Sequence, residues 1–138
     1  MRIADILTPT PITVGLDDSL AHLKQIFDSH AFHHLLVVTD GELFGIISDR
    51  DLLRTISPFV GGQSERPMDA ATLKRHAHQI MTRQPITATP DEPIEEAAQR
   101  MLEKRISCLP VVDPDGKLLG IVTWRDMLRG LCGLHRSK

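Results

Sequence analysis

The amino-acid sequence predicts an α+β fold built from two tandem repeats, each with the order strand, helix, strand, strand, helix. The first observation is a duplication: residues 45–51 return as residues 120–126, with Gly-Ile at the start and Arg-Asp at the end of both copies. The second is that short apolar runs alternate with segments of helical apolar spacing. The third is size, because about fifty residues with three short strands bury little core alone. We therefore expect the two repeats to pack sheet to sheet as one pseudo-two-fold module.

The duplication extends well beyond this segment. The matches are too dense over each repeat to be chance, and one inserted residue in the second hairpin shifts the alignment by a single position. The aligned pairs include Thr8 with Thr82, Pro11 with Pro85, Val37-Val38 with Val111-Val112, Gly41 with Gly116, and Leu53-Arg54 with Leu128-Arg129.

The first repeat is predicted to span residues 1–56. Asp17-Asp18-Ser19 is a helix start, and apolar residues at helical spacing follow it. Asp40-Gly41 between two apolar runs indicates a tight hairpin. The predicted elements are a strand at 12–14, a helix from 17 to about 30, strands at 35–39 and 43–48, and a helix at 49–56.

The second repeat, residues 79–132, follows the same order. Acids near the start of its first helix suit the helix dipole. The predicted elements are a strand at 86–88, a helix from about 92 to 104, strands at 109–113 and 118–123, and a helix at 124–131. Between the repeats, residues 57–78 form a linker whose Pro and Gly residues indicate a loop. A helix predicted at 69–80 then leads into the second repeat. Residues 133–138 are expected to be a frayed polar tail.

Composition excludes several classes of protein. The net charge is −2, so no overall field attracts nucleic acid or a membrane surface. No apolar run reaches about 18 residues, and the N-terminus lacks the apolar segment of a secretion signal. Two cysteines are too few for a disulfide framework. We expect a cytoplasmic protein that binds neither nucleic acid nor membrane.

Each copy of the duplicated segment places a hydroxyl residue and, three positions later, an acid at the start of a helix. The hydroxyl can cap the helix, and the open amides of the first turn attract anions such as phosphate. The acid can accept hydrogen bonds from a pair of neighbouring hydroxyls, as on a ribose. The same pattern also fits a plain capping box. Its repetition at matching places favours a ligand-binding role.

These features resemble a tandem CBS-domain pair, also called a Bateman module. The resemblance rests on the Leu-x-Val-Val strand, the Asp-Gly hairpin and the Gly-Ile-x-Ser/Thr-x-x-Asp turn, and it covers residues 4 to 131. It implies a free-standing regulatory module that binds an adenine nucleotide (AMP, ADP or ATP) in clefts between the two repeats, requires no metal, and acts on an unknown effector protein. It also implies a homodimer that pairs through apolar helix faces. The residues expected on those faces are Leu52, Leu53, Ile56, Met127, Leu128 and Leu131.

The resemblance also assigns binding roles by motif position. The acid holds the ribose hydroxyls, the hydroxyl residue lies near ribose or phosphate, and the Thr before the first strand contacts adenine or ribose. Apolar strand residues flank the base, and basic residues meet phosphate. In this sequence the positions are Asp51 and Asp126; Ser48 and Thr123; Thr8 and Thr82; Ile12, Ile46, Ile86 and Ile121; and His33, His34, Arg50 and Arg125.

The second repeat departs from the family pattern at one place. Ser107-Cys108 stands where the first repeat has His33-His34, so only the nearby Lys104 and Arg105 can supply positive charge there. Because histidine gains charge as pH falls through about 6.5, we expect phosphate binding at the first repeat to strengthen towards acid pH.

Three functions remain open on the sequence: a nucleotide-sensing regulatory module, a structural dimerisation module with empty clefts, and a sensor of another adenosyl compound such as S-adenosylmethionine. Intact Asp51 and Asp126 favour a ligand, and the basic residues favour one that carries phosphate. No Gly-rich phosphate loop or catalytic triad spacing is present, so we expect no enzyme. Adjacent His33 and His34 point to opposite faces of a strand, which disfavours a metal site. Cys108 is expected to be a buried apolar residue rather than a nucleophile.

Overall fold

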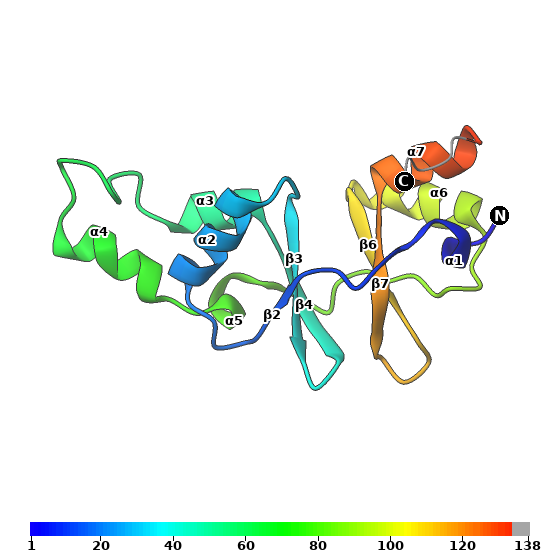
Figure 1. Cartoon of the computed structure of the whole chain (residues 1–138), viewed down its shortest axis with the longest axis horizontal. Coiled ribbons are helices and arrows are strands. Elements are labelled where there is room, and N and C mark those ends of the chain that lie inside the picture. The colour runs from blue at the N-terminus through cyan, green and yellow to red at the C-terminus, as the bar shows by residue number, and fades with distance from the viewer. Residues whose placement is uncertain (134–138) are drawn as a thin grey trace. The chain divides into compact units, whose positions relative to one another are not determined.

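The computed structural model describes residues 1–133, which form two compact units (Figure 1). We call them the α3 unit and the α7 unit, after the helix that begins within the duplicated segment in each. The α3 unit comprises Ile12–Asp40 and Phe44–Gln84. The α7 unit comprises Met1–Pro11, Gly41–Leu43 and residues 85–133. Each unit combines one sheet with helices, so the predicted α+β class is confirmed.

The α3 unit contains a four-stranded sheet in the order β2-β3-β4-β5. β2 is parallel to β3, whereas β4 and β5 are antiparallel. Ser19 caps the helix that begins at Leu20 by accepting a hydrogen bond from the His22 amide, as the sequence predicts. The strands are β2 (Thr13–Val14), β3 (His34–Thr39), β4 (Glu42–Ser48) and β5 (Thr82–Arg83); the main helices are α2 (Leu20–Ser29) and α3 (Asp49–Thr55).

The α7 unit contains a three-stranded sheet in the order β1-β7-β6, with antiparallel neighbours. The strand predicted at 86–88 is reduced to one parallel bridge between Ala88 and Val111. A strand of two residues, β1, is supplied by the N-terminal segment. The elements are α1 (Ile3–Ile6), β1 (Thr8–Pro9), α6 (Ile94–Lys104), β6 (Cys108–Val112), β7 (Leu118–Thr123) and α7 (Trp124–Leu131).

The linker does not form the single helix predicted at 69–80. It is divided into α4 (Pro67–Ala71), a 3-10 turn (Thr72–Lys74) and α5 (Ala77–Ile80). Arg75 and His76 between them are extended, because the Arg75 carbonyl accepts the Leu20 amide at the start of α2 and Ser19 bridges to His76. A tertiary contact thus interrupts the local helical preference.

Each unit has its own aliphatic core. In the α3 unit the buried cluster includes Leu35, Val37 and Ile47, and in the α7 unit it includes Leu109 and Val122. Two residues expected on exposed helix faces belong to these cores instead: Leu52 is 3% and Met127 4% exposed, so those two predictions are wrong. Leu53, Leu128 and Leu131 are exposed as expected. No described helix has the length and apolar character needed to cross a membrane.

The predicted polar tail lies, from residue 134, outside the described residues.

Candidate functional site

The glycine that begins each copy of the duplicated segment marks a close approach of two backbone segments. A Cβ atom on Gly120 would lie 2.5 Å from the carbonyl oxygen of Thr8. A Cβ atom on Gly45 would lie 2.6 Å from Sδ of Met81 and 3.0 Å from the carbonyl oxygen of Thr82. The separation at Gly120 is too short for a side chain, and a side chain at Gly45 would require Met81 to move, so the absence of a Cβ lets the neighbouring strand pair closely.

Those neighbouring strands bring one threonine beside each copy of the motif. β5 pairs Thr82 with Ile46 of β4, and β1 pairs Thr8 with Ile121 of β7. Directly opposed residues share one face of a sheet, and so do residues two positions apart on a strand. The two sets that share a face are Thr82, Ile46 and Ser48 in the α3 unit, and Thr8, Ile121 and Thr123 in the α7 unit.

This grouping differs from the order of the repeats. Thr8 belongs to the first repeat in sequence, yet the structure pairs it with the strand that leads to Asp126. Thr82 in turn lies beside the strand that leads to Asp51. A strand of two residues carries too little pattern to identify its partner from sequence. Glycine at the start of each motif copy was the one available signal of a close backbone approach.

The α3 turn, residues 48–51, joins β4 to α3 through a complete capping box. Ser48 Oγ accepts a hydrogen bond from the Asp51 amide at 3.1 Å, and Asp51 Oδ2 accepts one from the Ser48 amide at 2.9 Å. Among the residues that the structure describes, Oδ1 of Asp51 has no hydrogen-bond partner. Because a carboxylate can accept about four hydrogen bonds, most of this capacity is open to a hydroxyl-bearing ligand.

The α7 turn, residues 123–126, has the same capping box but a more enclosed acid. Asp126 Oδ2 accepts hydrogen bonds from the Thr123 amide at 2.9 Å and from Thr123 Oγ1 at 3.2 Å. Asp126 Oδ1 lies 3.4 Å from Nη1 of Arg129, and the residue is 4% exposed, whereas Asp51 is half-buried. The two acids are therefore equivalent in sequence and different in surroundings.

The two histidines predicted to meet phosphate are held by their own unit. Nδ1 of His33 lies 2.8 Å from Oδ2 of Asp49, the first residue of α3. Burial lowers the pKa of His34, partly opposed by the carboxylates of Asp49 and Asp51 and reinforced by His33. His34 therefore gains its charge at a lower pH than an ordinary histidine does, which corrects our expectation of a charge change near pH 6.5 at this residue. Sequence reasoning did not identify Asp49 as a partner of His33.

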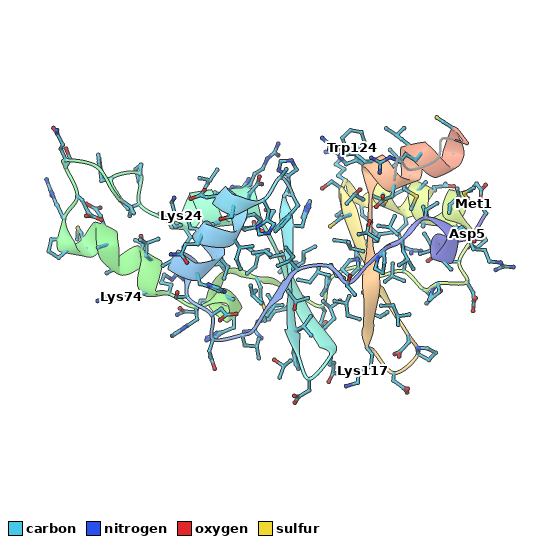
Figure 2. The ribbon with its side chains drawn as sticks, in the orientation of Figure 1. Met1, Asp5, Lys24, Lys74, Lys117 and Trp124 are labelled. Atoms are coloured by element: carbon cyan, nitrogen blue, oxygen red, sulfur yellow. The ribbon has the colours of Figure 1, made fainter. Side chains whose placement is uncertain are left out.

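In the α7 unit different chemistry occupies the same positions. Trp124 replaces Asp49; its amide donates to the Ser107 carbonyl at 3.0 Å, and its side chain is half exposed at the start of α7 (Figure 2). The guanidinium carbon of Arg125 lies 5.8 Å from the centroid of the Trp124 ring. Cys108 is buried, and burial raises its pKa to about 12, so the expected apolar role is confirmed.

The remaining site candidates are less closely tied to the turns. Ile12 is exposed at the start of the α3 unit, and Ile86 packs against the core of the α7 unit. Arg50 is exposed on the first turn of α3. In the described part of the chain, no group of three or more His, Cys, Asp or Glu side chains is placed to hold a metal ion.

Comparison with protein families gives two matches along the chain. The model described as the CBS domain matches residues 3–58 and again residues 77–133. These two matches cover most of the chain.

The chain is similar to several curated proteins. A CBS domain-containing protein of Dictyostelium discoideum is 35% identical, and the alignment covers 91% of this chain and 88% of that protein. An L-aspartate semialdehyde sulfurtransferase of Methanocaldococcus jannaschii is 34% identical, with 92% of this chain and 22% of that protein covered. The chain thus spans nearly the whole of one relative and about a fifth of the other.

Two solved structures share the fold over nearly their whole length. The CBS domain pair of protein MJ0100, in complex with 5′-methylthioadenosine and S-adenosyl-L-methionine, has a TM-score of 0.78 and 34% identity, covering 96% of this chain and 97% of that chain. CBSX2 in complex with AMP has a TM-score of 0.81 and 27% identity, covering 96% of both chains. Both ligand sets in those proteins contain adenosine.

Proposed function

The chain belongs to the CBS-domain family, and from this membership we propose that it is a regulatory module that binds an adenosyl ligand at the α3 turn and the α7 turn. In each turn the acid would accept the ribose hydroxyls, and the threonine of the neighbouring strand would lie on the face that receives the nucleoside. The ligand would then bias the conformation that a partner protein meets.

The observation that carries this proposal is the open carboxylate of Asp51. Its Oδ2 completes the capping box, while its Oδ1 has no partner among the described residues. The capping box uses only Oδ2 of Asp51, so Oδ1 is not needed to start the helix. Oδ1 is thus a hydrogen-bond acceptor at a helix start, where a pair of ribose hydroxyls can donate to it.

The α3 turn favours an adenosyl ligand with little negative charge. Asp49 and Asp51 place two carboxylates there, His33 is engaged by Asp49, and the pKa of His34 is lowered. Burial disfavours the charged form of His34 and so weakens its attraction for a triphosphate, whereas the sulfonium of S-adenosylmethionine meets favourable carboxylates. For the α3 turn, this observation supports a sensor of another adenosyl compound, either a sulfonium or a thioether, which is the third function that the sequence leaves open.

The α7 turn is the better candidate for a phosphorylated nucleotide. Trp124 stands there in place of Asp49, so the turn carries one acid fewer, while Arg125 is exposed beside it as Arg50 is beside the α3 turn. A guanidinium suits phosphate geometry. We therefore keep AMP, ADP and ATP as candidate ligands for this turn.

We propose no catalysis by this chain, and we propose that it acts in the cytoplasm as a homodimer on an effector protein. The apolar side chains available for pairing are Leu53, Leu128 and Leu131, which are exposed on α3 and α7.

Isothermal titration calorimetry tests the proposal. Adenosine, AMP, ATP, 5′-methylthioadenosine and S-adenosylmethionine are titrated into the wild type and into Asp51→Ala and Asp126→Ala. A hydrogen bond to a charged group contributes about 1.5–3 kcal/mol, so each substitution should weaken its own turn by roughly ten- to a hundredfold. Asp28→Ala removes an exposed acid on α2 and is the control. Binding that survives both site substitutions unchanged refutes the site, and no binding of any probe to the wild type refutes the function.

A further inference from the structure

We propose that Arg129 competes with a ribose for the carboxylate of Asp126, so that the α7 turn binds an adenosyl ligand more weakly than the α3 turn. The inference rests on the proposed function, because it concerns the order in which the two turns fill. Arg129 is not one of the ligand-binding positions of the motif, and the sequences of the two turns do not reveal this difference between them.

The two carboxylates differ in how many of their acceptor positions the protein occupies. A carboxylate has about four lone-pair positions. Asp126 uses two on Thr123 and one on Arg129, so at least three are occupied. Asp51 uses one on the Ser48 amide in the described structure. A ribose with two hydroxyl donors therefore finds room on Asp51 and must displace a protein donor on Asp126.

Arg129 also compensates the charge of the buried Asp126. Asp126 is 4% exposed, and burial of a carboxylate without compensation is costly. Arg129 supplies that compensation across the 3.4 Å contact. The Arg129 side chain is 43% exposed, so it can leave the carboxylate for solvent without disturbing the core. The pair is thus positioned to open, at a modest cost, when a ligand arrives.

The α3 unit supplies the internal comparison. Arg54 follows Asp51 at the spacing by which Arg129 follows Asp126, and the two arginines align in the duplication. Arg54 nevertheless makes no hydrogen bond or ion pair with any residue that the structure describes. The same three-residue spacing therefore gives a closed acid in one unit and an open acid in the other.

Each arginine is substituted in a variant in which only one of the two turns keeps its acid. Titration calorimetry uses 5′-methylthioadenosine, which lacks phosphate and reports ribose and base contacts alone. In Asp51→Ala, the further change Arg129→Gln should tighten binding by about two- to fivefold, the range expected from loss of a partly exposed ion pair. In Asp126→Ala, Arg54→Gln should leave the affinity unchanged. Arg129→Lys keeps the charge but loses the guanidinium fork, and should give an intermediate affinity.

Thermal unfolding without ligand first establishes that each variant folds, and Arg129→Lys replaces Arg129→Gln if the latter does not. Unchanged or weaker binding in Asp51→Ala/Arg129→Gln overturns the inference, and weaker binding would make Arg129 a ligand contact. An equal gain on Arg54→Gln would also overturn it, since the effect would then be one of net charge. Either result leaves the proposed function standing, whereas failure of the wild type to bind any adenosyl probe removes both.

Discussion

His33 and Asp49 are joined twice across the start of α3. The Asp49 amide donates to the His33 carbonyl at 2.9 Å, and the Asp49 carboxylate meets Nδ1 of His33 at 2.8 Å. The backbone bond recurs between Trp124 and Ser107 in the α7 unit, where these two positions carry neither an imidazole nor a carboxylate. The backbone of the duplicated segment is thus conserved between the units while its chemistry is not.

The first prediction concerns pH and His34. Burial lowers its pKa, so the unfolded chain binds a proton there at higher pH than the folded chain does. The contribution to stability is complete above the unfolded pKa of about 6.5 and is lost as pH falls below it. Urea denaturation should show a smaller loss of unfolding free energy between about pH 7.5 and about pH 5.5 in His34→Gln than in the wild type. The control is His22→Gln on α2; an identical pH dependence in His34→Gln and wild type contradicts the assignment.

The second prediction concerns Gly120. Gly120→Ala should lower the free energy of unfolding by about 1–3 kcal/mol, because its Cβ would meet the Thr8 backbone. Gly62→Ala is the matched control, since a Cβ there would make only an ordinary contact at 3.5 Å. Thermal or urea denaturation gives both values. Equal stability of the two variants would mean that β1 does not approach β7 as closely as described.

The third prediction concerns the thiols. Cys132 is exposed, whereas Cys108 is buried with a pKa of about 12. Because the thiolate is the reactive form, a thiol reagent at neutral pH should label Cys132 rapidly and Cys108 only after denaturation. Cys132→Ser should then show no fast labelling of the native protein. Fast labelling of that variant would place Cys108 at the surface.

The fourth prediction concerns self-association. If α7 pairs with a second copy, Leu128→Glu should convert a dimer into a monomer, because it places a charge in an apolar interface. Leu128 is 48% exposed. Leu102→Glu on α6 is the control, since Leu102 is 81% exposed and lies on another helix. Light scattering at micromolar concentration measures the mass. A wild-type monomer, or a Leu128→Glu dimer, would count against this face.

Local chemistry explains what the sequence could predict. The last helix runs from Trp124 to Leu131 and its preceding strand covers Leu118–Thr123, as expected, because the hydroxyl cap and the hairpin are both encoded within a few residues. The same reasoning located Ser48 and Asp51 at a helix start. Features set by neighbouring residues in the chain were therefore accessible.

Features set by distant residues were not accessible. The partners of β1 and β5 are decided by backbone hydrogen bonds to strands far along the chain, and the linker helix is interrupted where Arg75 bonds to Leu20. The difference between Arg54 and Arg129 is also invisible in sequence, since both follow their acid at one spacing. Such differences arise from packing, which periodicity does not report.

The pairing of β1 with β7 also bears on how the chain folds as it is synthesised. The α3 unit ends at Gln84, so all of its strands precede β6 and β7 in the order of synthesis. In residues 1–11, by contrast, β1 can pair only after β7 (Leu118–Thr123) has been translated. Contacts so distant in sequence close slowly. Residues 1–11 are therefore synthesised before the α3 unit, yet β1 pairs only after that unit is complete.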